Sequence, residues 1–274
     1  MAETGLDRNT SARAGGRLTG VTDRTIILAD AAYRDVKGAR VEVAVLPWGA
    51  TEPHNLHLPY GTDIVETVGI AAASARLAAE AGARITVLPI IPFGVNTGQM
   101  DLPLTINMNP STQLAVLDDV ASSIDAHGVP KLVILNGHGG NDFKQMIREI
   151  QGKHRAYLCT VDWYRAVNKS RFFEEPGDHA DEMETSLMMH LAPHLVLPLD
   201  EAGSGSVKVH RIRAFREGWA WAPRPWTKVS SDTGAGDPRK ATAEKGSAYF
   251  AAVTRAIADF FIDLAAANTK DLHV

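Results

Sequence analysis

The chain contains one cysteine, Cys159, among its 274 residues. A single cysteine excludes a disulfide within the chain, and it excludes a structural zinc site built from cysteines alone. Because Cys159 lies in an apolar stretch, residues 157–161, we expect its thiol to be buried and unreactive. Nothing in this composition calls for an oxidising compartment.

Long apolar runs and clusters of basic residues are also missing. No stretch approaches the roughly 18 uncharged apolar residues that a membrane-spanning helix needs. The formal net charge of −4 and the lack of a Lys/Arg block are not typical of nucleic-acid binding. The first twenty-odd residues are polar and lack the apolar core of a signal peptide. We therefore expect a soluble, cytoplasmic protein that acts on a small molecule and binds neither membrane nor nucleic acid.

Apolar runs of strand length alternate with helical patterns along the chain. The predicted strands, rich in Val, Ile and Leu, are residues 41–46, 85–91, 132–135 and 157–161. The predicted helices, with apolar residues at helical spacing, cover residues 65–79, 114–124 and 253–264. This alternation indicates an α/β fold with a mostly parallel sheet covered by helices. We predict one catalytic domain over residues 25–274, preceded by a loosely ordered N-terminal arm, residues 1–24.

The stretch from residue 201 to residue 238 breaks the alternation. Its glycines, prolines and three tryptophans, Trp219, Trp221 and Trp226, follow no period. Long irregular segments in compact domains are commonly lids, binding loops or subunit contacts. A small apolar core beneath a loop explains the tryptophans equally well.

A first group of ligand-type side chains follows the predicted strand 41–46. Residues two apart in an extended segment project to the same side, so Glu52 and His54 can approach one ion or an adjacent pair. Asp63, just before a predicted helix, can return to the same place.

A second group follows the strand 132–135, where residues 136–141 read Asn-Gly-His-Gly-Gly-Asn. His138 is thereby placed at the carboxyl end of a strand, where active sites of open α/β sheets lie. The flanking glycines let the backbone turn sharply, and such a turn would also suit a phosphate. A lone histidine, however, is more often a hydrogen-bonded structural residue than a ligand.

A third group places four carboxylates around His179, namely Asp178, Asp181, Glu182 and Glu184. Like charges this close repel unless a cation or protons relieve them, although acidic residues are also favoured at a helix N-terminus. Taken together, the three groups form a mixed histidine and carboxylate set that suits Zn, Mn or Fe. The chemistry that such a set implies is the activation of water.

At these residues the sequence resembles the creatininase (creatinine amidohydrolase) family. Residues 46–63 fit its opening motif, Leu-Pro-x-Gly-x-x-Glu-x-His-x-x-His-Leu-Pro-x-x-x-Asp, throughout. The likeness continues through residues 136–141, through His179-Ala180 with 184–186, and through 236–238 with 241–242 and 245–246. The resemblance implies a three-layer αβα sandwich with a mostly parallel central sheet, assembled as a homo-oligomer and frequently as a hexamer.

The resemblance also implies two divalent ions, with Zn expected and Mn or Fe as alternatives, bridged by Asp63 and a hydroxide. Glu52 and His138 would bind one ion with Asp63, and His54 would bind the other. Creatininase has a glutamate where this chain has Gly140, so we expect Glu184 to be the missing metal ligand.

Catalytic roles follow from the same resemblance. His179 matches the histidine that transfers a proton, and Glu184 is the second expected catalytic residue. Four further residues are candidates for contacting the substrate or supporting a ligand: His57, Gly139, Trp163 and Asp178. For His57, simple packing within its loop is nearly as good an explanation.

We therefore expect a metal-dependent hydrolase, an amidohydrolase in which metal-bound hydroxide attacks a carbonyl of a small, cyclic amide and a C–N bond breaks. The ligand residues do not separate this activity from a formamide deformylase or from ring-opening C–C or lactone hydrolysis of an oxidised cyclitol or sugar. The alternative from another class is a non-catalytic nucleotide-binding protein that uses residues 137–140. That reading lacks the phosphate-loop lysine and leaves Glu52, His54 and Asp63 unexplained.

Overall fold

The computed structural model describes residues 23–273, so the predicted arm, residues 1–24, lies almost wholly outside the described part. Four strands form one sheet: β1 (Val43–Trp48), β2 (Ile85–Val87), β3 (Lys131–Asn136) and β4 (Tyr157–Asp162). The sheet order is β2-β1-β3-β4 and every pairing is parallel, with Ala44 beside Leu132 and Leu132 beside Leu158. The predicted α/β class with a parallel sheet is therefore confirmed.

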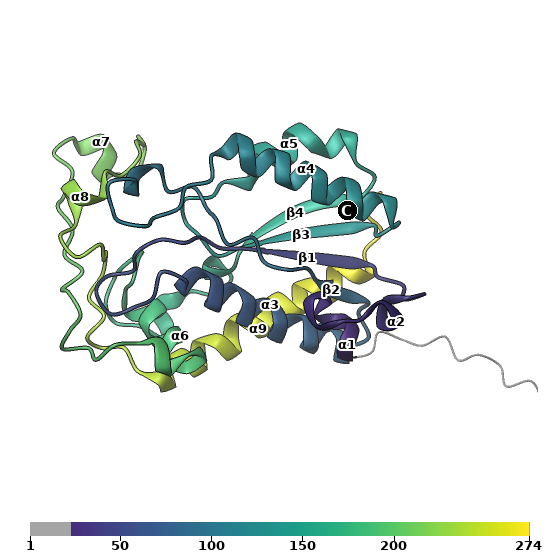
Figure 1. Ribbon diagram of the computed structural model, residues 1–274, viewed down its shortest axis with the longest axis horizontal. Coiled ribbons are helices and arrows are strands. Elements are labelled where there is room, and N and C mark those ends of the chain that lie inside the picture. The colour runs from purple at the N-terminus through teal and green to yellow at the C-terminus, as the bar shows by residue number, and fades with distance from the viewer. Residues whose placement is uncertain (1–22, 274) are drawn as a thin grey trace, which may run out of the picture.

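Helices cover both faces of this sheet and make three layers (Figure 1). One face carries α3 (Thr62–Glu80), α6 (Glu182–Leu191) and α9 (Ala243–Ala266), and the other carries α4 (Pro110–Ala126) and α5 (Phe143–Ile150). Separate apolar cores fill the two gaps, one around Val45, Ile70 and Phe261 and one around Leu46, Leu117 and Phe143. The strands β1, β2 and β3 are buried along their whole length because both faces are covered.

Two sequence predictions need correction here. The strand predicted for residues 85–91 ends at Val87, because Pro47 on β1 has no N–H to donate to Leu88; beyond that point the Ile91 N–H still donates to the Pro47 carbonyl. The thiol of Cys159 is half-buried rather than fully buried, although this burial still raises its pKa to about 12.

The helix α9 lies close against α6. At Gly246 an added Cβ would sit 1.9 Å from the carbonyl oxygen of Ser186, so only glycine allows this approach of the two backbones. Thr242 caps the start of α9 by accepting a hydrogen bond from the Lys245 N–H. This packing fixes α6, which carries Glu184, against the rest of the fold.

The segment 201–238 is irregular, as predicted, and contains only two short helices, α7 (Arg213–Arg216) and α8 (Trp226–Val229). Both helices lie together at one end of the molecule (Figure 1, green, left). Two more short helices, α1 (Asp23–Ile26) and α2 (Tyr33–Val36), lie near β2. Within residues 23–273, none of the helices is long and apolar enough to cross a membrane.

Candidate metal centre

Six of the predicted residues lie close together where the loops after β1 and β3 meet the starts of α3 and α6. They are Glu52, His54, Asp63, His138, His179 and Glu184, and each is at most 9% exposed. Buried carboxylates and imidazoles at this density need partners, because burial alone disfavours their charged forms.

The loop after β3 is held by its own asparagines. The Asn136 side chain accepts from the His138 N–H at 3.1 Å and donates to the His138 carbonyl at 3.0 Å, while Asn141 donates to Asn136. At Gly140 an added Cβ would lie 2.3 Å from the Val95 carbonyl oxygen. A glutamate at that position does not fit this loop.

One triad of metal-binding groups consists of Glu52, Asp63 and His138. The His138 Nδ1 atom lies 2.8 Å from Glu52 Oε1 and 3.1 Å from Asp63 Oδ2. Its other nitrogen, Nε2, faces the Val95 carbonyl oxygen at 3.1 Å and must donate a proton to it. That hydrogen bond leaves Nδ1 free to act as a ligand.

A second triad consists of His54, Asp63 and Glu184. The His54 Nε2 atom lies 3.0 Å from Asp63 Oδ1 and 3.9 Å from Glu184 Oε2, while Nδ1 donates to the Glu52 carbonyl oxygen. Asp63 therefore belongs to both triads, with one carboxylate oxygen facing each histidine. This is the geometry that a carboxylate bridging two ions requires.

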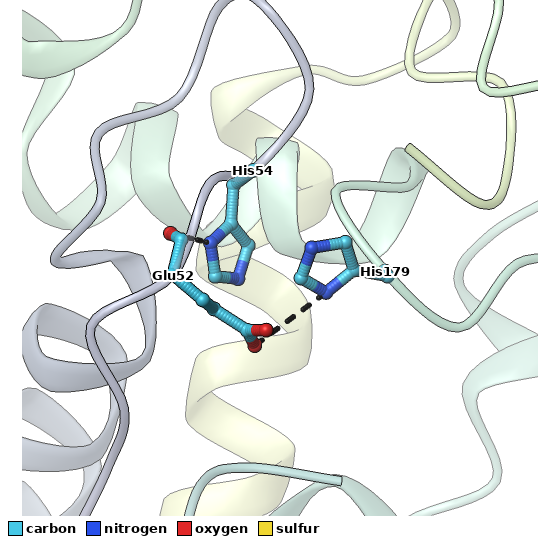
Figure 2. Close-up of side chains that lie close together, drawn as sticks. All are labelled: Glu52, His54 and His179. Atoms are coloured by element: carbon cyan, nitrogen blue, oxygen red, sulfur yellow. Dashed lines mark hydrogen bonds and ion pairs between the residues drawn. The ribbon is translucent and has the colours of Figure 1, made fainter. Parts of the chain in front are cut away.

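His179 lies beside Glu52 and His54 (Figure 2), and the three side chains are close enough together to hold an ion. The Nε2 atom of His179 donates to the Pro53 carbonyl oxygen at 2.9 Å, and its Nδ1 lies 3.8 Å from Glu52 Oε1. The His54 ring lies 4.2 Å away between centroids. Burial, with the charge of His54, lowers the pKa of His179, so its neutral form has an unprotonated Nδ1 that faces the site.

The ionisation of the centre is set by strong mutual interactions that work against burial. The neighbouring histidines hold the pKa values of Glu52 and Asp63 below their usual range. In turn, Asp63 raises the pKa of His54 to about 10, and Glu52 holds the pKa of His138 well above its usual value. Burial raises the pKa of Glu184 to about 8, and negative neighbours add to that shift. The carboxylates thus draw positive charge into the site, and oxygen and imidazole ligands fit divalent Zn or Mn.

The four candidate supporting residues are not alike. His57 does not enter either triad; its Nε2 lies 2.9 Å from Thr185 Oγ1 on α6, and burial with the charge of His54 lowers its pKa to about 4. Trp163 is a core residue whose indole N–H donates to Thr67. Gly139 is exposed, with open space beside its Cα. Asp178 is exposed and forms an ion pair with Arg224.

Two residues near the centre were not assigned roles from the sequence. Gln99, at the end of a short helical turn (Thr97–Gln99), is buried and donates from Nε2 to Glu52 Oε2. Glu66, one turn after Asp63 on α3, is fully buried, and neither of its carboxyl oxygens has a hydrogen-bond partner among the described residues. Burial, followed by the charges of Glu184 and Asp63, raises the pKa of Glu66 well above its usual value.

Comparison with known proteins assigns this arrangement to a family. Residues 29–261 match the profile named Creatininase, described as creatinine amidohydrolase. The chain belongs to the creatininase family. The family resemblance inferred from the motifs is therefore confirmed, and the protein is a hydrolase of this family with a metal-binding cluster.

Members of the creatininase family with different substrates resemble this chain. A mycofactocin precursor peptide peptidase from Mycobacterium tuberculosis is 31% identical over 225 residues, covering 76% of this chain and 80% of the relative. The creatinine amidohydrolase of Pseudomonas putida is 25% identical over 176 residues, covering 56% and 66%. The names of these two relatives give different substrates, a precursor peptide and creatinine.

Solved structures agree on the three-layer fold. A provisionally named creatinine amidohydrolase from Bacteroides fragilis matches with a TM-score of 0.86 and 43% identity, covering 92% of this chain and 100% of that one. A creatininase crystal structure matches with a TM-score of 0.70 at 23% identity, covering 86% and 96%. Other creatininase structures are described as Zn–Zn type and as Mn.

Proposed function

We propose that this protein is an amidohydrolase that uses two divalent metal ions to break the C–N bond of an amide, with a small cyclic amide as the first candidate substrate. The observation that carries the proposal is the position of Asp63: its Oδ1 atom faces His54 in one triad, and its Oδ2 atom faces His138 in the other. A dinuclear centre needs such a shared ligand, whereas a single ion does not.

Two sets of residues would bind the two ions. Glu52, His138 and Asp63 would hold one ion, and His54, Asp63 and Glu184 would hold the other. Divalent ions held there would lower the pKa of water and polarise the substrate carbonyl. Gln99 keeps the Glu52 carboxylate oriented by donating to its second oxygen.

Proton transfer falls to His179. Its Nε2 is occupied by the Pro53 carbonyl, so only Nδ1 faces the centre, and the lowered pKa leaves that atom able to accept a proton. Handing this proton to the leaving nitrogen would complete the cleavage of the C–N bond. Glu184, whose Oε2 lies 3.9 Å from His54 Nε2, would serve as a metal ligand and as a second carboxylate next to the reacting groups.

A peptide amide is the second candidate substrate. The relative from Mycobacterium tuberculosis is named as a peptidase of a precursor peptide, which makes a peptide bond the natural second candidate. Both candidates require the same attack at an amide carbonyl and differ only in what lies on either side of it.

The test is a substrate screen with zinc-loaded and manganese-loaded protein, read by mass spectrometry. The panel contains creatinine, hydantoin, N-formyl amines, short peptides, a lactone and a cyclic 1,3-diketone. We expect hydrolysis of at least one amide, abolished in a Glu52→Gln variant. Turnover of the lactone or diketone alone would contradict the C–N assignment. Assembly into a homo-oligomer stays a prediction, which light scattering of the same preparation tests.

A further inference from the structure

The lobe formed by residues 201–229 is tied to the candidate catalytic histidine by a closed ring of contacts. The Arg224 guanidinium donates to both oxygens of Asp178, at 3.1 and 2.6 Å. It also lies over the Trp226 ring, with Cζ 4.7 Å from the ring centroid. The Trp226 ring in turn lies 4.7 Å from the His179 ring between centroids, tilted by 55°. Asp178 precedes His179 in the chain, which closes the ring.

The same end of the lobe is also seated against the loop that carries Gln99. An added Cβ at Gly98 would lie 2.1 Å from the Arg224 carbonyl oxygen, so the two backbones are in direct contact. The Thr227 hydroxyl donates to the Asp101 carboxylate. Residues 224–227 therefore lie between two loops, one bearing His179 and the other bearing Gln99, which holds Glu52.

Gly203 and Gly205, at the start of the lobe, are hydrogen-bonded to Asn55, Asp232 and Gly236, whereas the part of the lobe between them and Arg224 is less closely joined to the body of the protein. A cavity of about 860 Å³ separates this part from the body, lined on the lobe side by residues such as Phe215, Arg216 and Trp221 and on the body side by Asp178 and Asp237. Trp221 is 84% exposed. The contacts of residues 224–227 are thus a principal attachment of the lobe next to the metal centre.

The orientation of the His179 ring depends on its neighbours. The one hydrogen bond of its ring among the described residues runs from Nε2 to the Pro53 carbonyl, so a single bond opposes rotation of the ring about Cβ–Cγ. The His54 ring and the Trp226 ring flank it, at 4.2 and 4.7 Å between centroids, and prevent that rotation. Nδ1 therefore stays directed at the centre only while Trp226 is in place.

We propose that Trp226 is a positioning residue for His179 and that the Arg224–Asp178 ion pair keeps the Trp226 ring packed against the His179 ring. The lobe thereby determines whether the proton-transferring nitrogen faces the substrate. The catalytic consequence rests on the proposed function of His179, whereas the placement of its ring does not depend on any substrate.

The experiment compares Trp226→Ala, Trp226→Phe and Asp178→Asn in the full-length, zinc-loaded protein, with Trp221→Ala as the matched control on the exposed part of the same lobe. Nitrogen-15 NMR of labelled histidines reports the tautomer of His179, whose signals are assigned with a His179→Gln variant. Limited trypsin digestion reports whether the lobe, which carries Arg211, Arg213 and Arg216, has come loose.

We expect Trp226→Ala to retain its zinc, to lose the single Nε2–H tautomer signal of His179 and to lower kcat at least tenfold on any amide of the panel that is hydrolysed. Trp226→Phe should restore most of the signal and the rate, because a smaller ring still packs on His179. Asp178→Asn should speed cleavage within the lobe, and Trp221→Ala should change none of these. An unchanged His179 signal in Trp226→Ala would overturn the proposal. If no amide is hydrolysed, the proposed function fails, while the NMR signal and the digestion still decide the role of Trp226.

Discussion

Replacing His138 with alanine removes a proposed ligand from one ion and leaves the other ion's protein ligands intact. In the wild-type protein His138 Nδ1 lies within 3.1 Å of both Glu52 and Asp63. The variant leaves only those two carboxylates for the first ion, whereas His54, Asp63 and Glu184 remain together for the second. We therefore expect the zinc content to fall from two ions per chain to about one.

The size of the effect has a lower bound. Losing a group that merely orients a metal ligand typically weakens binding by about 10 to 100-fold, and His138 is proposed as a ligand itself. The affinity for the first ion should therefore fall by at least about 100-fold, or about 2.7 kcal/mol. The two buried carboxylates would also repel each other once the histidine between them is gone, which acts in the same direction.

The assay is a titration with a coloured zinc chelator that competes for the ions, combined with elemental analysis after dialysis. His127→Ala is the matched control, since His127 follows α4 and is exposed. It should bind zinc as the wild type does. Two ions of undiminished affinity in His138→Ala would refute the assignment of this residue as a ligand.

Three further predictions concern bound metal, the contact between α6 and α9, and the thiol of Cys159. Removing metal with a chelator should lower Tm by about 5–10 °C, and adding zinc should restore it. The reason is that an ion that binds only the folded state, at a free concentration 100 times its Kd, stabilises that state by about 2.7 kcal/mol. An unchanged Tm would argue against a bound ion. Gly246→Ala should lower the free energy of unfolding, measured in urea, by about 2 kcal/mol, because the new Cβ would lie 1.9 Å from the Ser186 carbonyl oxygen. The control Gly152→Ala, whose Cβ would have no atom within 4 Å, should change the free energy of unfolding by less than about 0.5 kcal/mol. Because burial raises the pKa of Cys159 to about 12, its thiolate fraction at pH 8 is about 10⁻⁴, and Ellman's reagent should label it only after unfolding; rapid labelling of the native protein would contradict this.

Much of the fold could be predicted because its signals are local. Strands buried on both faces are continuous apolar runs, and three of the four predicted strands were placed within two residues of their observed bounds. The exception, β2, is shorter than predicted because Pro47 on the partner strand lacks an N–H, and that pairing cannot be read from residues 85–91 alone. The irregular character of residues 201–238 was also visible, because its glycines and prolines prevent regular structure.

The proposed ligands could be found for a different reason. Each of them follows a strand or starts a helix at the carboxyl edge of a parallel sheet, so the topology alone brings them together. Gly140 illustrates the limit of this reasoning. The motif shows that a glutamate is missing there, but only the structure shows that Val95 leaves no room for one.

The supporting interactions could not be predicted, since they join residues far apart in the sequence without a motif. Gln99 reaches Glu52 across 47 positions, and Arg224 reaches Asp178 across 46. Trp163, singled out by its place in the family pattern, lies in the core instead, with its N–H on Thr67. Such contacts depend on how loops are packed, which local patterns do not specify.

The central claim is that two metal ions share Asp63. Anomalous X-ray scattering at the zinc edge, from a crystal of the zinc-loaded protein, tests it most directly. We predict two peaks, one on either side of the Asp63 carboxylate, the first within bonding distance of Glu52 and His138 and the second within bonding distance of His54 and Glu184. A single peak that does not contact Asp63, or no peak in the cluster, would contradict it.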